Sequence, residues 1–252
     1  MQGVMYVTGK LGGGKGIYLM HQAHQYYRAG RRVAANFDIN TEHISNKSDN
    51  SIFRIPDRPR IEDLELLGRG CPEGEKEAFG CLLLDEAGTW LNCRNFRDKG
   101  RKELLDWFIH ARKMGWDVYV GVQNEGMVDN QIFSATGEHI TFCQRAFNIR
   151  VPFFSDLLEI FAPKSFGRMA KKRKRIFPHY VTARSYKGSP SRTNKPIEKV
   201  LIKASDYYDY YDTNYVFTEQ QEFKKDGSTW DARASFSILP GSTLFEWYKP
   251  KL

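Results

Sequence analysis

The chain has 252 residues, enough for one complete α/β domain with a smaller appendage. Its 41% hydrophobic and 27% charged residues are typical of a globular protein and exclude a disordered or fibrous one. No window reaches the roughly 18 to 20 apolar residues of a transmembrane helix, and the N-terminus lacks the basic flank of a signal peptide. We therefore expect these residues to stay in the cytosol.

The net charge of +8 is unevenly distributed. Residues 1–150 hold 20 basic and 19 acidic side chains, whereas residues 151–252 hold 18 and 11. Six of the eight residues from Arg168 to Arg175 are basic. Such a run can contact DNA or anionic lipid, or it can be a solvated loop. Few aromatic residues interleave with it, as a platform for stacking single-stranded bases would need.

Hydrophobic periodicity predicts alternating strands and helices in the first two thirds of the chain. Continuous apolar runs predict buried strands, and apolar residues at helical spacing predict two helices. The predicted strands are 4–7, 32–39, 81–84, 117–123 and 140–143, and the predicted helices are 15–28 and about 99–114. Residues 40–60 are polar and contain proline, which indicates an excursion outside the core.

This alternation predicts an α/β fold of the P-loop NTPase class, with a mostly parallel sheet covered by helices. Beyond about Pro163 the pattern changes to basic and then aromatic-rich segments, such as Tyr207–Phe217 and Ala234–Leu239. We expect a P-loop domain over 1–165 and a small β-containing appendage over 166–252. The four cysteines form no CxxC pair and are expected to be buried thiols: Cys71, Cys81, Cys93 and Cys143.

A glycine-rich loop follows the first predicted strand and precedes a helix, which is the context that a Walker A motif requires. Its backbone N–H groups and the helix N-terminus would bind phosphates, and its lysine would contact the β- and γ-phosphates of ATP. The alternative is a merely flexible turn. The predicted phosphate-binding residues are Gly9, Lys10, Gly12, Gly13, Gly14, Lys15 and Gly16.

Gly16 departs from this motif, which has Ser or Thr after the lysine to supply a hydroxyl to Mg²⁺. A water or another residue must then hold the metal, so hydrolysis is less certain than nucleotide binding. A Gly16→Thr substitution is expected to raise magnesium affinity or turnover, unless another residue already fills that position.

The run Leu82-Leu83-Leu84-Asp85-Glu86 has the form of a Walker B strand that delivers two acids at its carboxyl end. Asp85 is predicted to hold Mg²⁺, and Glu86 to orient and deprotonate the attacking water. Gln123 ends the next predicted strand at the same edge of the sheet. Its amide either senses the γ-phosphate or satisfies a loop backbone.

Oligomeric ATPases commonly supply an arginine to the γ-phosphate of a neighbouring subunit. The candidates are Arg94, Arg97, Arg112 and Arg145, and for any one of them a solvated or ion-paired surface residue is the favoured alternative. Arg112 is our first choice, because it lies near the end of a predicted helix, from which it could emerge near Gln123.

Four segments give the chain a resemblance to a known family. They are GKLGGGKG, RIPDRPRIEDL, LLLDEAGTWLNCRNF and DWFIHARKMGWDVYVGVQ, which begin at Gly9, Arg54, Leu82 and Asp106. They resemble the assembly ATPases of filamentous phages in the zonular occludens toxin family, and the tryptophan-bearing segments are more specific than the nucleotide motifs.

The resemblance implies an assembly and export factor that uses ATP to extrude virions at the cytoplasmic face of the host inner membrane. The implied partners are other copies of the chain in a ring, phage coat and export proteins, single-stranded phage DNA or its packaging protein, and the membrane through a segment outside these residues. In that role Lys15 would be the catalytic lysine, Asp85 and Glu86 the acid pair, and Gln123 the sensor. The alternatives are a nucleotide-binding structural subunit without appreciable turnover, which Gly16 favours, and a small-molecule kinase, for which no lid or acceptor site is evident.

Overall fold

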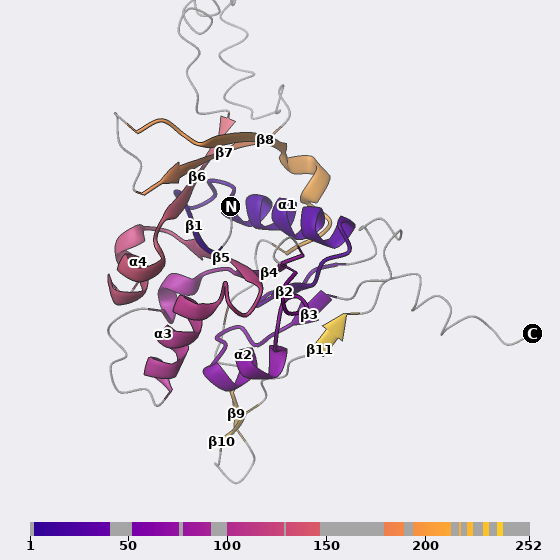
Figure 1. The fold of residues 1–252 in the computed structure, drawn as a ribbon. Helices are drawn as coiled ribbons and strands as arrows, with labels where there is room; N and C mark the ends of the chain where they lie inside the picture. The colour runs from indigo at the N-terminus through magenta and orange to yellow at the C-terminus, as the bar shows by residue number, and fades with distance from the viewer. Residues whose placement is uncertain are drawn as a thin grey trace, which may run out of the picture.

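The computed structural model describes residues 3–40, 52–75, 78–91, 100–128, 130–146, 179–188, 194–212, 217, 221–223, 229–231 and 236–238. Within these ranges, nine strands form one sheet in the order β11-β3-β2-β4-β5-β1-β6-β7-β8 (Figure 1). Its strands are β1 (Val4–Thr8), β2 (Val33–Ala35), β3 (Ile52–Arg54), β4 (Gly80–Leu84), β5 (Trp116–Val122), β6 (His139–Arg145), β7 (Tyr180–Lys187), β8 (Glu198–Lys203) and β11 (Phe236–Ile238).

The centre of the sheet is parallel, and its two margins are antiparallel. Strands β3, β2, β4, β5, β1 and β6 pair in parallel, while β7, β8 and β11 add antiparallel strands outside them. The predicted α/β class with a mostly parallel sheet is therefore confirmed.

Helices cover both faces of this sheet. Helix α1 packs on one face, and the three other α-helices lie on the opposite face (Figure 1). Their bounds are α1 (Lys15–Arg28), α2 (Ile61–Leu67), α3 (Arg101–His110) and α4 (Asn130–Thr136), and short 3₁₀ turns are η2 (Ala87–Thr89), η3 (Glu125–Met127) and η5 (Ala204–Tyr207). Among the described residues, no helix combines the length and apolar character needed to cross a membrane.

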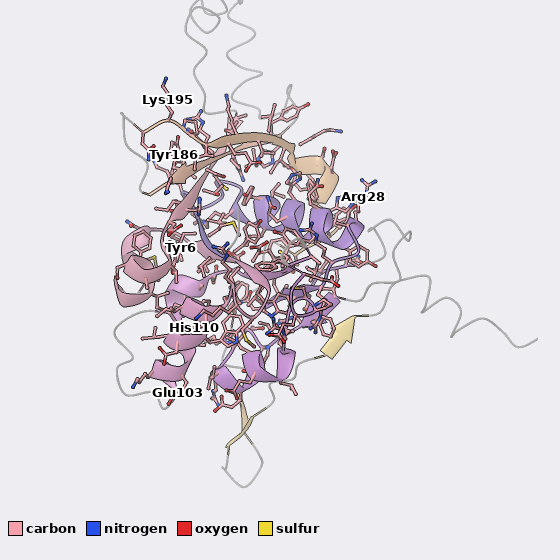
Figure 2. The ribbon with its side chains drawn as sticks, in the orientation of Figure 1. Tyr6, Arg28, Glu103, His110, Tyr186 and Lys195 are labelled. Atoms are coloured by element: carbon pink, nitrogen blue, oxygen red, sulfur yellow. The ribbon has the colours of Figure 1, made fainter. Side chains whose placement is uncertain are left out.

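Coverage on both faces explains the continuous apolar runs. In β4, Cys81 and Leu83 join the cluster beneath α1, whereas Leu82 and Leu84 join the cluster beneath α2, α3 and α4. Because successive side chains point to opposite faces of a strand, every position is apolar when both faces are buried. Figure 2 shows side chains filling this interior, with Tyr6 inside and Arg28, Glu103 and Lys195 toward the outside.

Most predicted elements exist, but their extents differ. Helix α1 has the predicted bounds, β1, β4, β5 and β6 lie within a few residues of theirs, and α3 is shorter than expected. Strand β2 covers only three residues of the predicted 32–39. The expectation that residues 40–60 lie outside the core is wrong for 52–55, because β3 pairs with β2 and Ile52 and Ile55 are buried. Helices α2 and α4 were not predicted.

Three of the described strands of the C-terminal part belong to the main sheet. β7 and β8 extend it beyond β6, and β11 pairs with β3 at the other margin. A separate hairpin joins β9 (Gln221–Phe223) and β10 (Thr229–Asp231). The part after residue 165 thus contains β-structure, as expected, but much of it is continuous with the parallel core. The division at residue 165 stays a prediction, and the basic run 168–175 lies outside the described residues. Cys71, Cys81 and Cys143 are buried, and Cys93 is outside the described residues.

One fully buried asparagine joins three segments behind the acid pair. The Nδ2 atom of Asn36 donates to the carbonyl oxygens of Asp57 (2.8 Å) and Asp85 (3.1 Å). Its Oδ1 atom accepts from the backbone N–H of Asp85 (2.8 Å). Asn36 itself is 0% exposed, so the side chain satisfies buried backbone groups that no water reaches.

We expect Asn36→Ala to lower the free energy of unfolding by about 3 kcal/mol. The substitution removes the hydrogen bonds that Asn36 makes to the N–H of Asp85 and to the carbonyl groups of Asp57 and Asp85, all of which are buried. Urea unfolding should show a lower midpoint with an unchanged slope. The matched control is Asn194→Ala; the Asn194 amide donates to the Lys187 carbonyl at an exposed position, so its loss should cost less than about 1 kcal/mol. Equal losses in the two variants would contradict this account of Asn36.

Candidate functional site

The site lies where the carboxyl ends of β1, β4 and β5 meet. These strands are neighbours and parallel, so the loops that follow them emerge at one edge of the sheet. A cavity of about 580 Å³ opens there. It is lined by residues of the glycine loop, the acid pair, the segment after β5 and the C-terminal part: Leu11, Gly12, Gly13, Gly14, Lys15, Gly16, Ile17, Asp85, Glu86, Gly88, Thr89, Gly121, Val122, Gln123, Met127, Arg145, His179, Tyr208 and Tyr211.

The glycine loop has the shape of an anion-binding turn. Gly14 lies immediately before α1 with φ 99°, a conformation that side-chain-bearing residues rarely adopt. The Nζ atom of Lys15 donates to the carbonyl oxygen of Gly9 at 3.1 Å, which folds the lysine back over the loop. The N–H of Gly13 closes a turn onto the carbonyl of Lys10 at 2.7 Å. The first turn of α1 therefore presents its N-terminus to the cavity.

Asp85 is the buried acid of the site. It directly follows β4, is 6% exposed, and has its Oδ1 atom 2.9 Å from the backbone N–H of Glu86. A side chain at Gly121 would place Cβ 2.6 Å from the same oxygen, so only glycine on β5 leaves room for this carboxylate. Burial raises the pKa of Asp85, while the Glu86 N–H, the Tyr211 hydroxyl and Lys15 oppose that rise. The carboxylate is thus desolvated but surrounded by donors and a positive charge.

Glu86 is the exposed acid beside it. Its φ of 50° makes it the one non-glycine residue with positive φ among those the structure describes. A turn holds this conformation, since Thr89 donates to the Glu86 carbonyl through both its N–H (3.1 Å) and its hydroxyl (2.9 Å). Partial burial and the neighbouring Asp85 raise the pKa of Glu86, against the effect of Lys15. A carboxylate with a raised pKa is a better proton acceptor for water.

These residues fit a magnesium ion held jointly with a nucleotide. Mg²⁺ in phosphate sites takes one or two carboxylates, and phosphate and water oxygens complete its shell. Asp85 supplies a buried carboxylate, and the cavity connects it to the phosphate loop. In the described parts of the chain, no cluster of three or more His, Cys, Asp or Glu could hold a metal without such a ligand.

The structure brings most of the predicted site residues to this cavity. Gly12, Gly13, Gly14, Lys15 and Gly16 line it, with Asp85, Glu86 and Gln123. Gly9 and Lys10 do not line it and act through their carbonyls within the loop. The roles given to each residue remain predictions.

Arg145 and Arg112 lie at different places relative to the cavity. Arg145, at the end of β6, lines the chain's own cavity. The expectation that Arg112 emerges near Gln123 is wrong. Arg112 precedes β5 and so lies at its amino end, whereas Gln123 follows its carboxyl end, seven strand residues or roughly 20 Å away. Arg112 cannot serve the site of its own chain; whether it serves a neighbour's site stays a prediction. Arg94 and Arg97 lie outside the described residues.

Sequence reasoning missed the contribution of the C-terminal part. His179, Tyr208 and Tyr211 reach the cavity, and the hydroxyl of Tyr211 donates to Oδ2 of Asp85 at 3.0 Å. The aromatic richness of Tyr207–Phe217 was visible in the sequence, but no pattern linked it to the nucleotide motifs.

Comparisons with known proteins show which family the chain resembles. The family model described as zonular occludens toxin (Zot) matches residues 3–187. The chain is 33% identical over 251 residues to the Gene 1 protein of Enterobacteria phage M13, covering 98% of this chain and 67% of that protein. It is also 33% identical over 223 residues to the Gene 1 protein of Enterobacteria phage I2-2, covering 87% and 58%. The chain thus spans about 58% to 67% of the length of these relatives.

Two solved structures are similar at a lower sequence identity. One is the N-terminal domain of zonular occludens toxin from Neisseria meningitidis, with a TM-score of 0.45, 15% identity, and coverage of 84% of this chain and 100% of that one. The other is the genome packaging NTPase B204 from Sulfolobus turreted icosahedral virus 2 in complex with AMP, with a TM-score of 0.41, 15% identity, and coverage of 78% and 98%. The family match over most of the chain and the identity to the phage proteins carry the assignment. The chain belongs to the zonular occludens toxin (Zot) family.

Proposed function

We propose that the chain binds ATP with Mg²⁺ in this cavity and hydrolyses it to drive assembly and extrusion of filamentous phage. The observation that carries the proposal is the meeting of Lys15, Asp85, Glu86 and Gln123 around one cavity at the carboxyl edge of a parallel sheet. These residues follow the carboxyl ends of β1, β4 and β5, which are distant in sequence and adjacent in the sheet.

The chemistry follows from what each group can do. The loop N–H groups and Lys15 would bind the phosphates, and Arg145 adds a second positive charge from β6. Glu86 would accept a proton from water as the water oxygen bonds to the γ-phosphorus. The bond from that phosphorus to the bridging oxygen then breaks, which releases ADP and inorganic phosphate. Gln123, which lines the same cavity, would hold the water with its amide. A bound Mg²⁺ would neutralise charge on the phosphates beside Asp85.

The biological setting rests on the family. The relatives are Gene 1 proteins of filamentous phages. We propose that the chain acts at the cytoplasmic face of the host inner membrane, as a ring-like homo-oligomer, with phage coat and export proteins and with single-stranded phage DNA or its packaging protein. Attachment to the membrane would use a segment outside these 252 residues.

The second candidate is a nucleotide-binding structural subunit with little or no turnover. Gly16 is the observation that favours it, because the phosphate loop supplies no hydroxyl to the metal. Steady-state hydrolysis by the purified chain separates the two candidates.

Lys15→Ala should weaken ATP binding by at least about tenfold without unfolding the domain, because charge-assisted contacts to phosphate are lost and no core contact is removed. Calorimetric titration with ATP measures the change. Lys113→Ala is the matched control, since Lys113 is exposed beyond α3, at the amino end of β5. Equal ATP affinity in the Lys15 variant and the native chain would remove Lys15 from the phosphate site.

Glu86→Gln should leave ATP bound and lower the turnover by about 10²-fold or more, because the amide keeps the shape of the side chain and loses the base. Turnover and ATP affinity are measured on the same preparation. Glu103→Gln, on the outer side of α3 (Figure 2), controls for the loss of one acidic charge. Full turnover in Glu86→Gln would exclude Glu86 as the base.

If a neighbouring copy supplies Arg112, turnover per chain should rise with protein concentration. Arg112→Ala and Lys15→Ala chains, each inactive alone, should recover partial activity when mixed, because some intact Lys15 sites would then face an intact Arg112. Activity in the mixture no greater than the sum of the two variants would contradict a shared site.

A further inference from the structure

The space beside Gly16 is already occupied. Gly16 is the second residue of α1 and lines the cavity. A Cβ atom added to it would lie 2.8 Å from Cε1 of Tyr211 and 3.5 Å from Cζ. The first distance is shorter than a normal carbon–carbon contact of about 3.5 to 4 Å. The tyrosine ring therefore stands where a side chain at position 16 would begin.

The hydroxyl of that ring reaches the acid of the site. It donates to Oδ2 of Asp85 at 3.0 Å, while Oδ1 accepts from the Glu86 N–H at 2.9 Å. Each oxygen of the carboxylate thus has its own donor, and the carboxylate plane is fixed. A hydroxyl, a carboxylate and the start of α1 meet here, although residue 16 has no side chain.

Tyr211 is held in place by the segment that carries it. This segment, residues 204–212, follows β8 and packs along α1; we call it the tyrosine strap. The Tyr207 hydroxyl and Nδ1 of His21 share a hydrogen bond of 2.8 Å. The Asn40 N–H donates to the Tyr210 carbonyl at 2.8 Å. The ring of Tyr211 packs edge-on against Phe37, with centroids 4.9 Å apart.

We propose that Tyr211 is a positioning residue of the magnesium site, which fills the place of the side chain that Gly16 lacks and orients Asp85 with its hydroxyl. A hydroxyl is thereby supplied beside the start of α1 by residue 211, and it acts through Asp85. This inference rests on the proposed function, since it concerns the metal that accompanies the nucleotide.

The first test uses Tyr211→Phe, which keeps the ring and removes the hydroxyl. Affinity for a non-hydrolysable ATP analogue is measured by calorimetry in MgCl₂ and in EDTA. We expect the gain in affinity due to Mg²⁺ to fall by about tenfold, the size of one hydrogen bond to a charged group, with the affinity in EDTA unchanged. Tyr210→Phe removes a hydroxyl from the same strap, outside the cavity lining, and should keep the native gain.

The second test exchanges the two positions. In the native chain Gly16→Thr should lower the gain in nucleotide affinity that Mg²⁺ gives, because its Cβ collides with the Tyr211 ring. This is the reverse of the improvement expected from the sequence. In a Tyr211→Ala background, where the ring is absent, Gly16→Thr should instead raise the gain. The effect of Gly16→Thr on affinity is expected to change sign only if the side chains at positions 16 and 211 compete for the same space. A general loss of stability would not produce this change of sign.

The outcomes are distinct. If Mg²⁺ raises the nucleotide affinity of Tyr211→Phe as much as that of the native chain, the inference is overturned and the proposed function stands. Tighter nucleotide binding in Tyr211→Ala than in the native chain also overturns it, because Tyr211 would then obstruct the site. If the native chain binds no nucleotide in either buffer, the proposed function itself fails.

Discussion

The site depends on the position of β5 between β1 and β4. All three strands are parallel, so the glycine loop, the acid pair and Gln123 leave the sheet at the same edge. The pairing also fixes the register, with Leu84 opposite Val120 and Val7 opposite Gly121. A slip of one residue would turn every side chain of the slipped strand to the opposite face, where the close-packed clusters have no matching space. Hydrophobic burial thus determines where the polar groups meet.

The same pairing makes the burial of Asp85 possible. A desolvated carboxylate is costly unless donors surround it. Gly121 of β5 gives it space, and Asn36 holds its backbone from behind. Glu86, one residue later, leaves the strand direction through its left-handed conformation and reaches solvent. Two adjacent acids therefore have different environments, one buried and one exposed, on which the roles proposed for them rest.

Local patterns in the sequence predicted the parts of this site that depend on local structure. GKLGGGKG needed only a strand before it and a helix after it, and LLLDE needed only a buried strand. Short elements escaped prediction because tertiary contacts stabilise them: β3 has three residues, and α2 has two buried residues, Leu64 and Leu67. Arg112 was misplaced because helical spacing gives the face of a helix and not the end of the sheet at which the helix stops. Tyr211 was missed because its contact with Asp85 joins residues 126 positions apart, and no local pattern encodes such a contact.

The position of the tyrosine strap late in the sequence also determines when it can join the site during synthesis. A ribosome makes the phosphate loop first and the strap long after it, and β11, which closes the far margin of the sheet, follows later still. At roughly 5 to 20 residues per second, the interval between the loop and Tyr211 is of the order of ten seconds or more. Once residue 86 has been made, the nascent chain carries its phosphate loop and both acids, and it still lacks the hydroxyl that orients Asp85. The site that the strap completes is therefore assembled only after residue 211 has been synthesised, long after its phosphate loop.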